Sequence, residues 1–561
     1  MATVSRRPVV AGAILLTAAG LVAGGCGSSG TSSSATSACT STSGTPVTAS
    51  AASAASSPHA TNARPAAGWT LPGADLQNTR DVQSAITSSN VTHLGVAWTV
   101  PLNINTTHTD GAYATTPVVV NGVVYVQDLE SDVLAISLAT GKVLWTHDYN
   151  SPNGGPDGVN VVNRTVYAAT NHAAVALDAA TGTQLWSRTL IGNQHEGIDM
   201  TPGYNRGTVY VSTVPVNPST AVVYGGGGQA TLWALNAATG APEWSWDEVQ
   251  DLWGNPGINS GGGQWYAPSF DAQGNIYFGV ANPGPLGGVK GYPWGTSRPG
   301  PDLYTDSVVK LSPSGKLLWY YQLTPHDLYD WDLQDPPVLT TAHGQPVVID
   351  GGKAGILIEL SAQTGKLIWK LPVGAHNGHD QDGLLTENAT PQSHVGLPAE
   401  FCLQPGALGG IETQLASNGS TTFAAVNDLA MLVNATGYTG LATAAGIEAI
   451  INATGEMVAV SQDTGTIEWD TRLPSTPYGA ASVTNDVVFT TTFHGDLYAL
   501  NAATGAILLK TPLSAGTNAP VAVDGDYVIA GAGTSLAGTQ QPMIIAYKLG
   551  AHGKLPDTVS P

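Results

Sequence analysis

The chain repeats a pattern in which apolar and polar residues alternate, a Thr-Gly or Ser-Gly dipeptide follows, and a tryptophan stands on the segment after the dipeptide. In one copy the alternating residues are 134–138, the dipeptide is Thr140-Gly141, and the tryptophan is Trp145. Alternation is typical of a strand with one buried face, and glycine supplies the positive φ of a tight turn. Each copy therefore predicts a β-hairpin.

The same unit recurs along the body of the chain. The dipeptides and their tryptophans are Thr140-Gly141 with Trp145, Thr181-Gly182 with Trp186, Thr239-Gly240 with Trp244, Ser314-Gly315 with Trp319, Thr364-Gly365 with Trp369, and Thr464-Gly465 with Trp469. A seventh copy, Thr504-Gly505, has Leu509 at the tryptophan position. The closest neighbours, Gly141 to Gly182 and Gly465 to Gly505, are about 40 residues apart, which is the length of one propeller blade.

These repeats predict an all-β fold, an eight-bladed β-propeller over residues 66–550. A tryptophan at a fixed place in each sheet can pack between neighbouring sheets, with its N–H free to donate to a backbone carbonyl. Residues 520–523 and 543–547 provide an eighth blade, whose missing strand is expected from residues 94–98. The alternative is a linear array of β-domains, which would need capping repeats that the sequence does not show.

The N-terminus predicts export with a lipid attachment point. Arg6 and Arg7 precede an apolar stretch over residues 9–25, too short for a spanning helix, so residues 1–25 are expected to be a signal peptide. Small residues before Cys26 resemble a bacterial lipobox, which makes Cys26 the expected lipidated residue; simple secretion is the alternative. The Ser/Thr/Ala-rich residues 26–65 are expected to form a disordered tether, and residues 551–561 a C-terminal tail.

The net charge and the number of cysteines further restrict the classes of protein that the sequence can encode. The chain has 19 Lys and Arg against 40 Asp and Glu, a formal net charge of −21, so nucleic-acid binding is not expected. Cys402 is the only cysteine in the predicted propeller, and Cys39 lies in the tether. The sequence therefore predicts a core without an intrachain disulfide, stabilised by its size.

The body also resembles a known family, the quinoprotein dehydrogenases, which are eight-bladed propellers that use pyrroloquinoline quinone (PQQ). The likeness runs from Trp69 to about Gly550. It is carried, besides the tryptophan repeats, by residues 69–98, by Trp265 with Phe270-Asp271 and Asn275 to Gly279, by Tyr304-Thr305-Asp306-Ser307, and by Thr324-Pro325-His326-Asp327 to Asp332.

The resemblance implies a site on the propeller axis that holds PQQ and a calcium ion. It places Trp265 at the floor of the quinone pocket and Lys353 at the cationic contact to the quinone oxygens. Asn282 falls on a calcium ligand, and Asp302 falls on the catalytic base, whose carboxylate also often binds calcium. The implied reaction is hydride transfer from an alcohol to the quinone.

Several positions depart from the family pattern. Gly155-Pro156 replaces an adjacent cysteine pair, Val161 replaces an arginine, and the expected calcium-binding glutamate falls in residues 224–228, which contain no carboxylate. Glu412-Thr413 replaces Asn-Trp, and Tyr478 replaces a tryptophan. We expect Asp199, Glu196 or Glu412 to supply the missing charge, with Asp199 as the metal ligand.

Two classes of function follow. The first is an exported oxidoreductase, held at the outer face of the cell membrane only by its lipid anchor, that oxidises a small alcohol with PQQ and calcium and passes electrons to a membrane acceptor. The second is a non-catalytic propeller lipoprotein that acts as a binding or envelope-assembly scaffold. The retained Trp265, Asn282, Asp302 and Lys353 favour the first, and the lost cysteines, arginine and glutamate favour the second. An enzyme with an altered cofactor is a third possibility.

Overall fold

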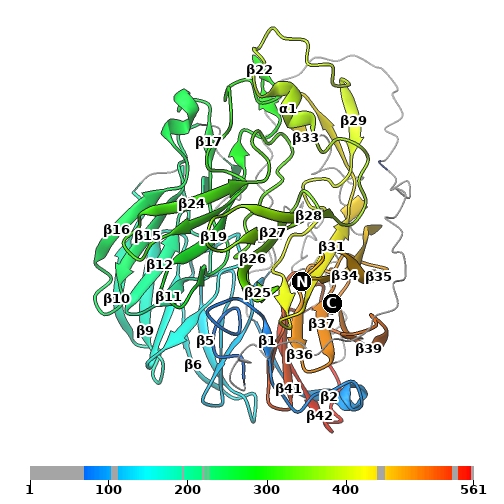
Figure 1. Cartoon of the computed structure of the whole chain (residues 1–561). Helices are drawn as coiled ribbons and strands as arrows, with labels where there is room; N and C mark the ends of the chain where they lie inside the picture. The colour runs from blue at the N-terminus through cyan, green and yellow to red at the C-terminus, as the bar shows by residue number, and fades with distance from the viewer. Residues whose placement is uncertain are drawn as a thin grey trace, which may run out of the picture.

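The structure is a computed structural model that describes residues 39, 68–102, 112–192, 195–217, 222–223, 226–438, 449–450, 452–533 and 541–556. The described chain is almost entirely β-structure (Figure 1). Eight sheets form its body, seven with four antiparallel strands and one with a fifth strand added in parallel. The signal segment, the lipidation residue Cys26 and all of the tether except Cys39 lie outside the described residues. The predicted blades can therefore be compared with the structure directly, and the leader remains a prediction.

The first four blades follow one another along the chain. Blade 1 comprises β3 (Val118–Val120), β4 (Val123–Gln127), β5 (Val133–Ser137) and β6 (Val143–His147). Blade 2 comprises β7 (Asn160–Val162), β8 (Thr165–Ala169), β9 (Ala173–Asp178) and β10 (Gln184–Thr189). Blade 3 comprises β11 (Gly203–Asn205), β12 (Thr208–Ser212), β15 (Thr231–Asn236) and β16 (Pro242–Asp247). Blade 4 comprises β18 (Ser269–Phe270), β19 (Ile276–Val280), β23 (Ser307–Leu311) and β24 (Leu317–Gln322).

The last four blades complete the body. Blade 5 comprises β25 (Val338–Ala342), β26 (Gln345–Gly352), β27 (Ile356–Ser361) and β28 (Leu367–Pro372). Blade 6 comprises β30 (Ala416–Ser417), β31 (Thr421–Asp428), β34 (Thr454–Ser461) and β35 (Ile467–Leu473). Blade 7 comprises β36 (Ser482–Thr484), β37 (Val487–Thr491), β38 (Asp496–Asn501) and β39 (Ile507–Pro512), with β1 (Asp81–Val82) added beside β36. Blade 8 comprises β40 (Ala522–Asp524), β41 (Tyr527–Ala532), β42 (Met543–Leu549) and β2 (Leu94–Pro101).

The ring closes where the two ends of the body meet. The N-terminal strand β2 pairs antiparallel with the C-terminal strand β42, so residues 94–98 do supply the outer strand of blade 8, as predicted (Figure 1). The first strand of blade 8, β40, contacts the first strand of blade 1, β3. Pairing of distant chain ends removes the exposed sheet edges that an open array would leave. The linear-array alternative is therefore wrong.

Tryptophans join neighbouring blades as the repeats predict. Each lies over the turn glycine of the next blade, and a Cβ placed on Gly365, for example, would come within 2.7 Å of the Trp319 ring. Each indole Nε1 donates to a carbonyl of that turn: Trp98 to Leu138, Trp145 to Ala179, Trp186 to Ala237, Trp244 to Pro313, Trp319 to Ala362, Trp369 to Gln462, and Trp469 to Ala502. The junction from blade 7 to blade 8 carries Leu509 instead.

Shorter elements gather at one end of the ring (Figure 1). They include the hairpin β21 (Gly288–Val289) with β22 (Tyr292–Pro293), the helix α1 (Asp382–Thr386), and the sheet formed by β29 (Glu400–Leu403), β32 (Met431–Asn434) and β33 (Gly437–Tyr438). The remaining short elements are η1 (Val91–His93), η2 (Asp251–Gly254), β13 (Val216–Asn217) with β14 (Val222–Val223), and β17 (Ser260–Gly261) with β20 (Pro283–Gly284). Among the described residues, no helix has the length and apolar character needed to cross a bilayer.

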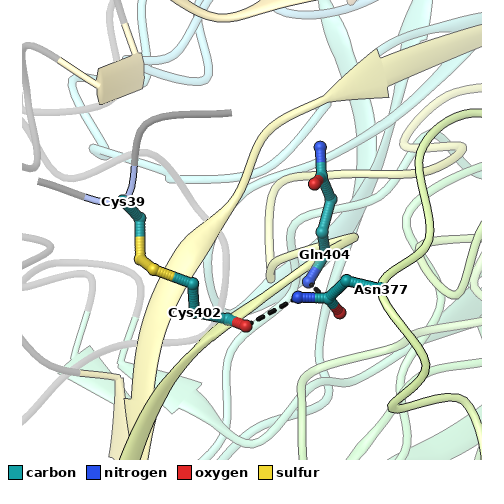
Figure 2. The surroundings of a disulfide bond; sticks show 4 residues. All are labelled: Cys39, Asn377, Cys402 and Gln404. Carbon is teal, nitrogen blue, oxygen red and sulfur yellow. Dashed lines mark hydrogen bonds between the residues drawn. A yellow bond between two sulfur atoms is a disulfide. The ribbon is translucent and has the colours of Figure 1, made fainter. Parts of the chain in front are cut away.

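The structure contains a disulfide bond that the sequence analysis did not predict. Cys39, in the predicted tether, is bonded to Cys402 on β29, with the two Cα atoms 5.8 Å apart (Figure 2). The Cys402 carbonyl also accepts a hydrogen bond of 2.7 Å from Asn377 Nδ2. The prediction of no intrachain disulfide was wrong because it considered only the propeller, whereas the partner cysteine lies 363 residues away in the segment before it.

Candidate active site

A narrow cavity lies beside Trp265, at one end of the central axis of the propeller. Its lining comes from the segments that immediately precede the first strands of seven blades. These residues are Ala114, Pro156, Trp265, Tyr266, Gln334, Leu408, Glu412, Thr413, Tyr478 and Asn518. Because the first strands surround the axis, segments that precede them converge on one end of it. Sequence segments separated by several hundred residues therefore share one small space.

Trp265 and Lys353, predicted to share the cofactor site, are brought together. The Lys353 Nζ lies 5.2 Å from the centroid of the Trp265 ring, a cation–π distance. Trp265 follows a turn in which Gly262 and Gly263 have positive φ, and Lys353 directly follows β26. The side chain of Lys353 is 1% exposed, so its charge is held away from solvent above an aromatic face.

Two aspartates that the sequence did not assign to the site neutralise Lys353. Its Nζ lies 3.2 Å from Asp330 Oδ2 and forms a second ion pair with Asp332. Burial by itself lowers the pKa of Lys353, but these carboxylates outweigh it and raise the pKa above its usual value. The sequence by itself assigned no role at the site to Asp330. The acidic run in residues 327–335 is the only sequence signal for its actual role.

Asn282 and Asp199 lie against the same group. The Asn282 backbone N–H donates to Asp332 Oδ1 at 2.6 Å, so Asn282 is joined to the Lys353 cluster through its main chain. Asp199 is buried, hydrogen-bonds to the Trp265 side chain, and leaves its Oδ1 without a partner. Burial raises the pKa of Asp199 to about 7, although the Trp265 contact opposes the shift.

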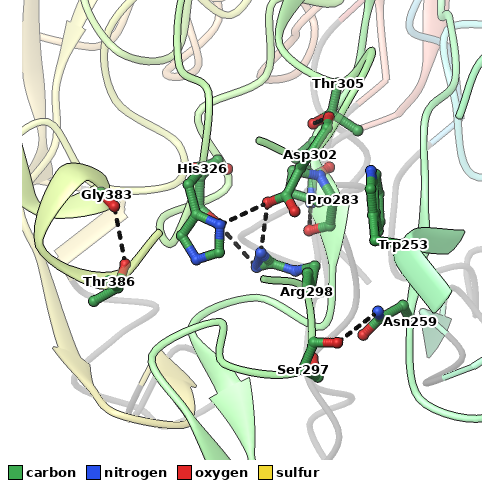
Figure 3. Close-up of polar contacts among 12 residues, drawn as sticks. Trp253, Asn259, Pro283, Ser297, Arg298, Asp302, Thr305, His326, Gly383 and Thr386 are labelled. Atoms are coloured by element: carbon green, nitrogen blue, oxygen red, sulfur yellow. Dashed lines mark hydrogen bonds and ion pairs between the residues drawn. The ribbon is translucent and has the colours of Figure 1, made fainter. Parts of the chain in front are cut away.

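Asp302 lies in a neighbouring polar cluster. Its Oδ2 accepts a hydrogen bond of 2.8 Å from Arg298 Nη1 and lies 3.3 Å from His326 Nδ1 (Figure 3). Burial raises the pKa of Asp302 well above its usual value, although Arg298 opposes the shift. In the described part of the chain, Asp302 does not line the cavity beside Trp265. The structure therefore groups Trp265, Lys353, Asn282 and Asp199, and sets Asp302 beside them with partners of its own.

Several departures from the family pattern lie at this end of the propeller. Pro156 and Tyr478 line the cavity, and Gly155 packs so closely on Asp199 that a Cβ there would clash with it. Val161, at the position of the family arginine, is a buried residue of β7. Of the candidates for the missing charge, Asp199 contacts Trp265, whereas Glu412 follows a turn that packs on Lys353.

The donor set indicates what the site can hold. Within the described parts of the chain, no group of three or more His, Cys, Asp or Glu residues is arranged as a ready metal centre. Buried carboxylate oxygens nevertheless lack partners at Asp157, Asp199, Asp330 and Glu412. Unpaired buried carboxylates are costly, and they are the oxygen donors that hard cations prefer. These residues fit a hard cation, and Trp265 with Lys353 fits a flat, anionic ring.

Comparison with known proteins shows which families and structures the chain resembles. The family model for the PQQ β-propeller domain of glucose, ethanol and alcohol dehydrogenases matches residues 233–393. The model for outer membrane protein assembly factor BamB matches residues 95–249 and 439–541. The structure aligns with the crystal structure of quinohemoprotein alcohol dehydrogenase from Comamonas testosteroni with a TM-score of 0.70 and 23% identity, covering 88% of this chain and 82% of that one. It aligns with a europium-containing methanol dehydrogenase with a TM-score of 0.68 and 18% identity, covering 86% and 98%. These alignments confirm the β-propeller fold.

Two sequence relatives show how much of the chain is similar to the quinoprotein dehydrogenases. The Comamonas testosteroni quinohemoprotein alcohol dehydrogenase is 31% identical over 57% of this chain and 49% of its own length. The XoxF protein of Paracoccus denitrificans is 26% identical over 80% of this chain and 83% of its own length. The chain thus spans about half the length of the first of these relatives and most of the second. The chain is homologous to the quinoprotein alcohol dehydrogenases, which confirms the resemblance predicted from its motifs.

Proposed function

We propose that this protein is a quinoprotein oxidoreductase that oxidises an alcohol or a related hydroxyl compound with bound PQQ and a hard metal ion. The observation that carries the proposal is the position of Lys353 over Trp265 at the axial end of a propeller homologous to quinoprotein alcohol dehydrogenases. When bound there, the quinone supplies a hydride acceptor and the ion a Lewis acid.

The residues of this chain have defined tasks in the proposed site. Trp265 and Lys353 would hold the quinone, the indole by contact with its flat ring and the ammonium by contact with its oxygens. Asn282 and Asp199 provide oxygen donors for the ion, which we propose is calcium or a lanthanide because both are hard cations. By resemblance, Asp302 is a candidate for the base that takes the hydroxyl proton.

Location and electron transfer form a separate part of the proposal. Export by residues 1–25 and lipidation at Cys26 would hold the protein at the outer face of the cell membrane, near a membrane electron acceptor. Disulfides persist in oxidising compartments outside the cytoplasm, so the Cys39–Cys402 bond supports export. Mass spectrometry of the mature N-terminus tests this part, since a lipid mass on Cys26 is expected and an unmodified Met1 would contradict it.

Reconstitution tests the proposed activity. Purified protein is mixed with PQQ and either calcium or a lanthanide, and quinone absorbance and alcohol-dependent dye reduction are measured. Tight binding with dye reduction is expected. A Trp265→Ala variant should bind PQQ more weakly, whereas Trp244→Ala, which removes a blade-docking tryptophan away from the axis, should bind it like wild type once folded. Absence of both signals in wild type would refute the proposal.

A non-catalytic scaffold is the second candidate function. It is favoured by the match of the BamB model to 95–249 and 439–541, together with Val161 at the position of the family arginine. The same reconstitution separates the two functions, because a scaffold does not require PQQ binding at Trp265.

A further inference from the structure

We propose that the end of the propeller with the candidate active site, the site end, faces the lipid bilayer, and that Leu384 and Leu385 contact the bilayer there. The inference rests on the proposed location, in which a lipid on Cys26 anchors the protein. It adds the orientation of the anchored protein, which the anchor alone leaves open. Two independent observations carry it: the place where the Cys39–Cys402 disulfide attaches the N-terminal segment, and the exposure of the two leucines.

The disulfide attaches the N-terminal segment at the site end. Cys402 is an exposed residue of β29, which forms a sheet with β32 and β33. The next residue, Leu403, belongs to one buried cluster with Leu408 and Tyr478, and both of these line the cavity beside Trp265. The sheet therefore packs directly against the cavity lining. The disulfide is bonded to the surface that covers the candidate site.

The position of this bond limits how far the anchor can lie from the site end. Cys39 is 13 residues after Cys26, and a fully extended chain of that length spans about 45 Å. The next residue that the structure describes is Gly68, which is 42 residues after Cys26, and for that length the limit is about 150 Å. The disulfide thus keeps β29 near the membrane surface, whereas attachment through Gly68 alone would allow either end of the ring to face lipid.

Two exposed leucines lie on α1, which is found with β29 at the same end of the ring (Figure 1). Leu384 is 57% exposed and Leu385 is 56% exposed. In the described chain, the other exposed large apolar side chains all lie on the outer strands of blades. Burial of apolar side chains at the boundary between headgroups and acyl chains is favourable. The leucine pair therefore provides a contact with lipid at the end that the disulfide holds near the membrane.

The leucine pair and the disulfide belong to one connected surface. Phe401, next to Cys402, stacks on His379 with the ring centroids 4.1 Å apart. His379 Nδ1 lies 2.7 Å from Asp382 Oδ2 at the start of α1, and the same oxygen accepts a hydrogen bond of 2.6 Å from Tyr329. Because Asp382 is buried, the inner face of α1 is held by these contacts and the leucine pair is left on the outer face.

Lipid without net charge is the partner that fits this surface. The chain has a formal net charge of −21, so attraction to anionic headgroups does not supply the contact. The contact comes instead from burial of the leucine pair and from the short covalent connection to the anchor. In this orientation the proposed quinone site faces the membrane in which the electron acceptor is proposed to lie.

Fluorescence quenching tests the orientation. The full lipidated chain with Leu385→Cys is labelled with a nitrobenzoxadiazole maleimide and reconstituted in phosphatidylcholine vesicles. The new thiol is the one available for labelling, because Cys39 and Cys402 are bonded to each other and Cys26 carries the lipid. Lipids brominated on their acyl chains should quench this label at least about twofold, since interfacial apolar residues reach roughly 5–10 Å into the boundary. The matched control is Leu185→Cys, which is also 56% exposed but lies on β10, and its label should not be quenched.

Breaking the disulfide tests its part in the orientation. In the double variant Cys39→Ser and Cys402→Ser, shown to be folded by circular dichroism, quenching at Leu385→Cys should fall to the level of the Leu185→Cys control. Reduction of the bond in the otherwise unchanged chain should have the same effect. Quenching that persists after the bond is broken would overturn the proposal that the disulfide sets the orientation.

The remaining outcomes separate this inference from the proposals on which it rests. Equal quenching of the two labels, or stronger quenching at Leu185→Cys, would overturn the orientation. A Leu385→Cys label that stays in water on vesicles and is covered only when a protein acceptor is added would overturn the lipid contact. An unmodified Cys26 would overturn the proposed location and this inference together. Alcohol-dependent dye reduction, measured in detergent without vesicles, reports on the proposed oxidoreductase function independently of all these results.

Discussion

Glu248 offers a quantitative test of how the axial site is held together. This buried glutamate follows β16 and accepts three hydrogen bonds of 2.7 Å. At Oε1 the donors are Ser212 Oγ and Gln264 Nε2, and at Oε2 the donor is the Gly263 N–H. These bonds shape the turn that presents Trp265. The isosteric change Glu248→Gln keeps the shape of the side chain but directs an amide donor at one of three existing donors.

The size of the expected change in unfolding free energy follows from the pKa of Glu248. Burial raises it from 4.5 to about 7, although all three hydrogen bonds favour the charged form. Because the folded pKa lies above the unfolded value, the contribution of this group to stability is complete below pH 4.5 and is lost as the pH rises through 7. At about 1.4 kcal/mol per pH unit, the loss amounts to roughly 3 kcal/mol.

Guanidinium unfolding of both proteins at pH 4.5 and pH 8 measures this effect. The difference in unfolding free energy between wild type and Glu248→Gln should move by roughly 3 kcal/mol in favour of the variant as the pH rises. Glu243→Gln, on an exposed part of β16, is the control for a glutamate change in the same blade. A difference that does not change with pH, or that moves in favour of wild type, would refute the reasoning.

Three further predictions concern blade docking and the charged cluster. Gly365→Ala should lower the unfolding free energy by roughly 2–4 kcal/mol, because the new methyl group meets Trp319 and the backbone φ is +69°. In the same denaturant assay, Gly525→Ala, at φ +60° with open space around it, should lower the unfolding free energy by only roughly 1–2 kcal/mol. Equal losses in the two variants would contradict the docking contact. Lys353→Met should lower the unfolding free energy by roughly 3–5 kcal/mol at pH 8, because it leaves two buried aspartates unpaired. Part of this loss should be recovered at pH 5, where the aspartates take up protons. A variant as stable as wild type at pH 8 would count against the ion pairs. Asp199→Ala should weaken calcium binding about tenfold in calorimetric titration, and equal affinities would remove Asp199 from the metal site.

The limits of sequence-based inference appear at the charged residues. Lys353 was predicted to contact the quinone, but nothing in the sequence identified Asp330 and Asp332 as its partners. Ion pairing depends on which loops meet at the axis: Lys353 lies in the turn between β26 and β27, whereas the two aspartates lie in the segment that joins blade 4 to blade 5. Asp302 was assigned through a motif, yet the fold surrounds it with Arg298 and His326.

The blades themselves were determined by the sequence alone, because each hairpin depends on contacts between near neighbours in the chain. Alternating residues, a turn glycine and a tryptophan specify a sheet and the surface it offers to the next one, so fold class and blade number could be predicted without coordinates. Only the tertiary structure decided what lies at the centre. Ring closure brings Glu412 beside Trp265, and a disulfide joins Cys39 to Cys402 across 363 residues; both pairings depend on distances between segments that no local pattern encodes.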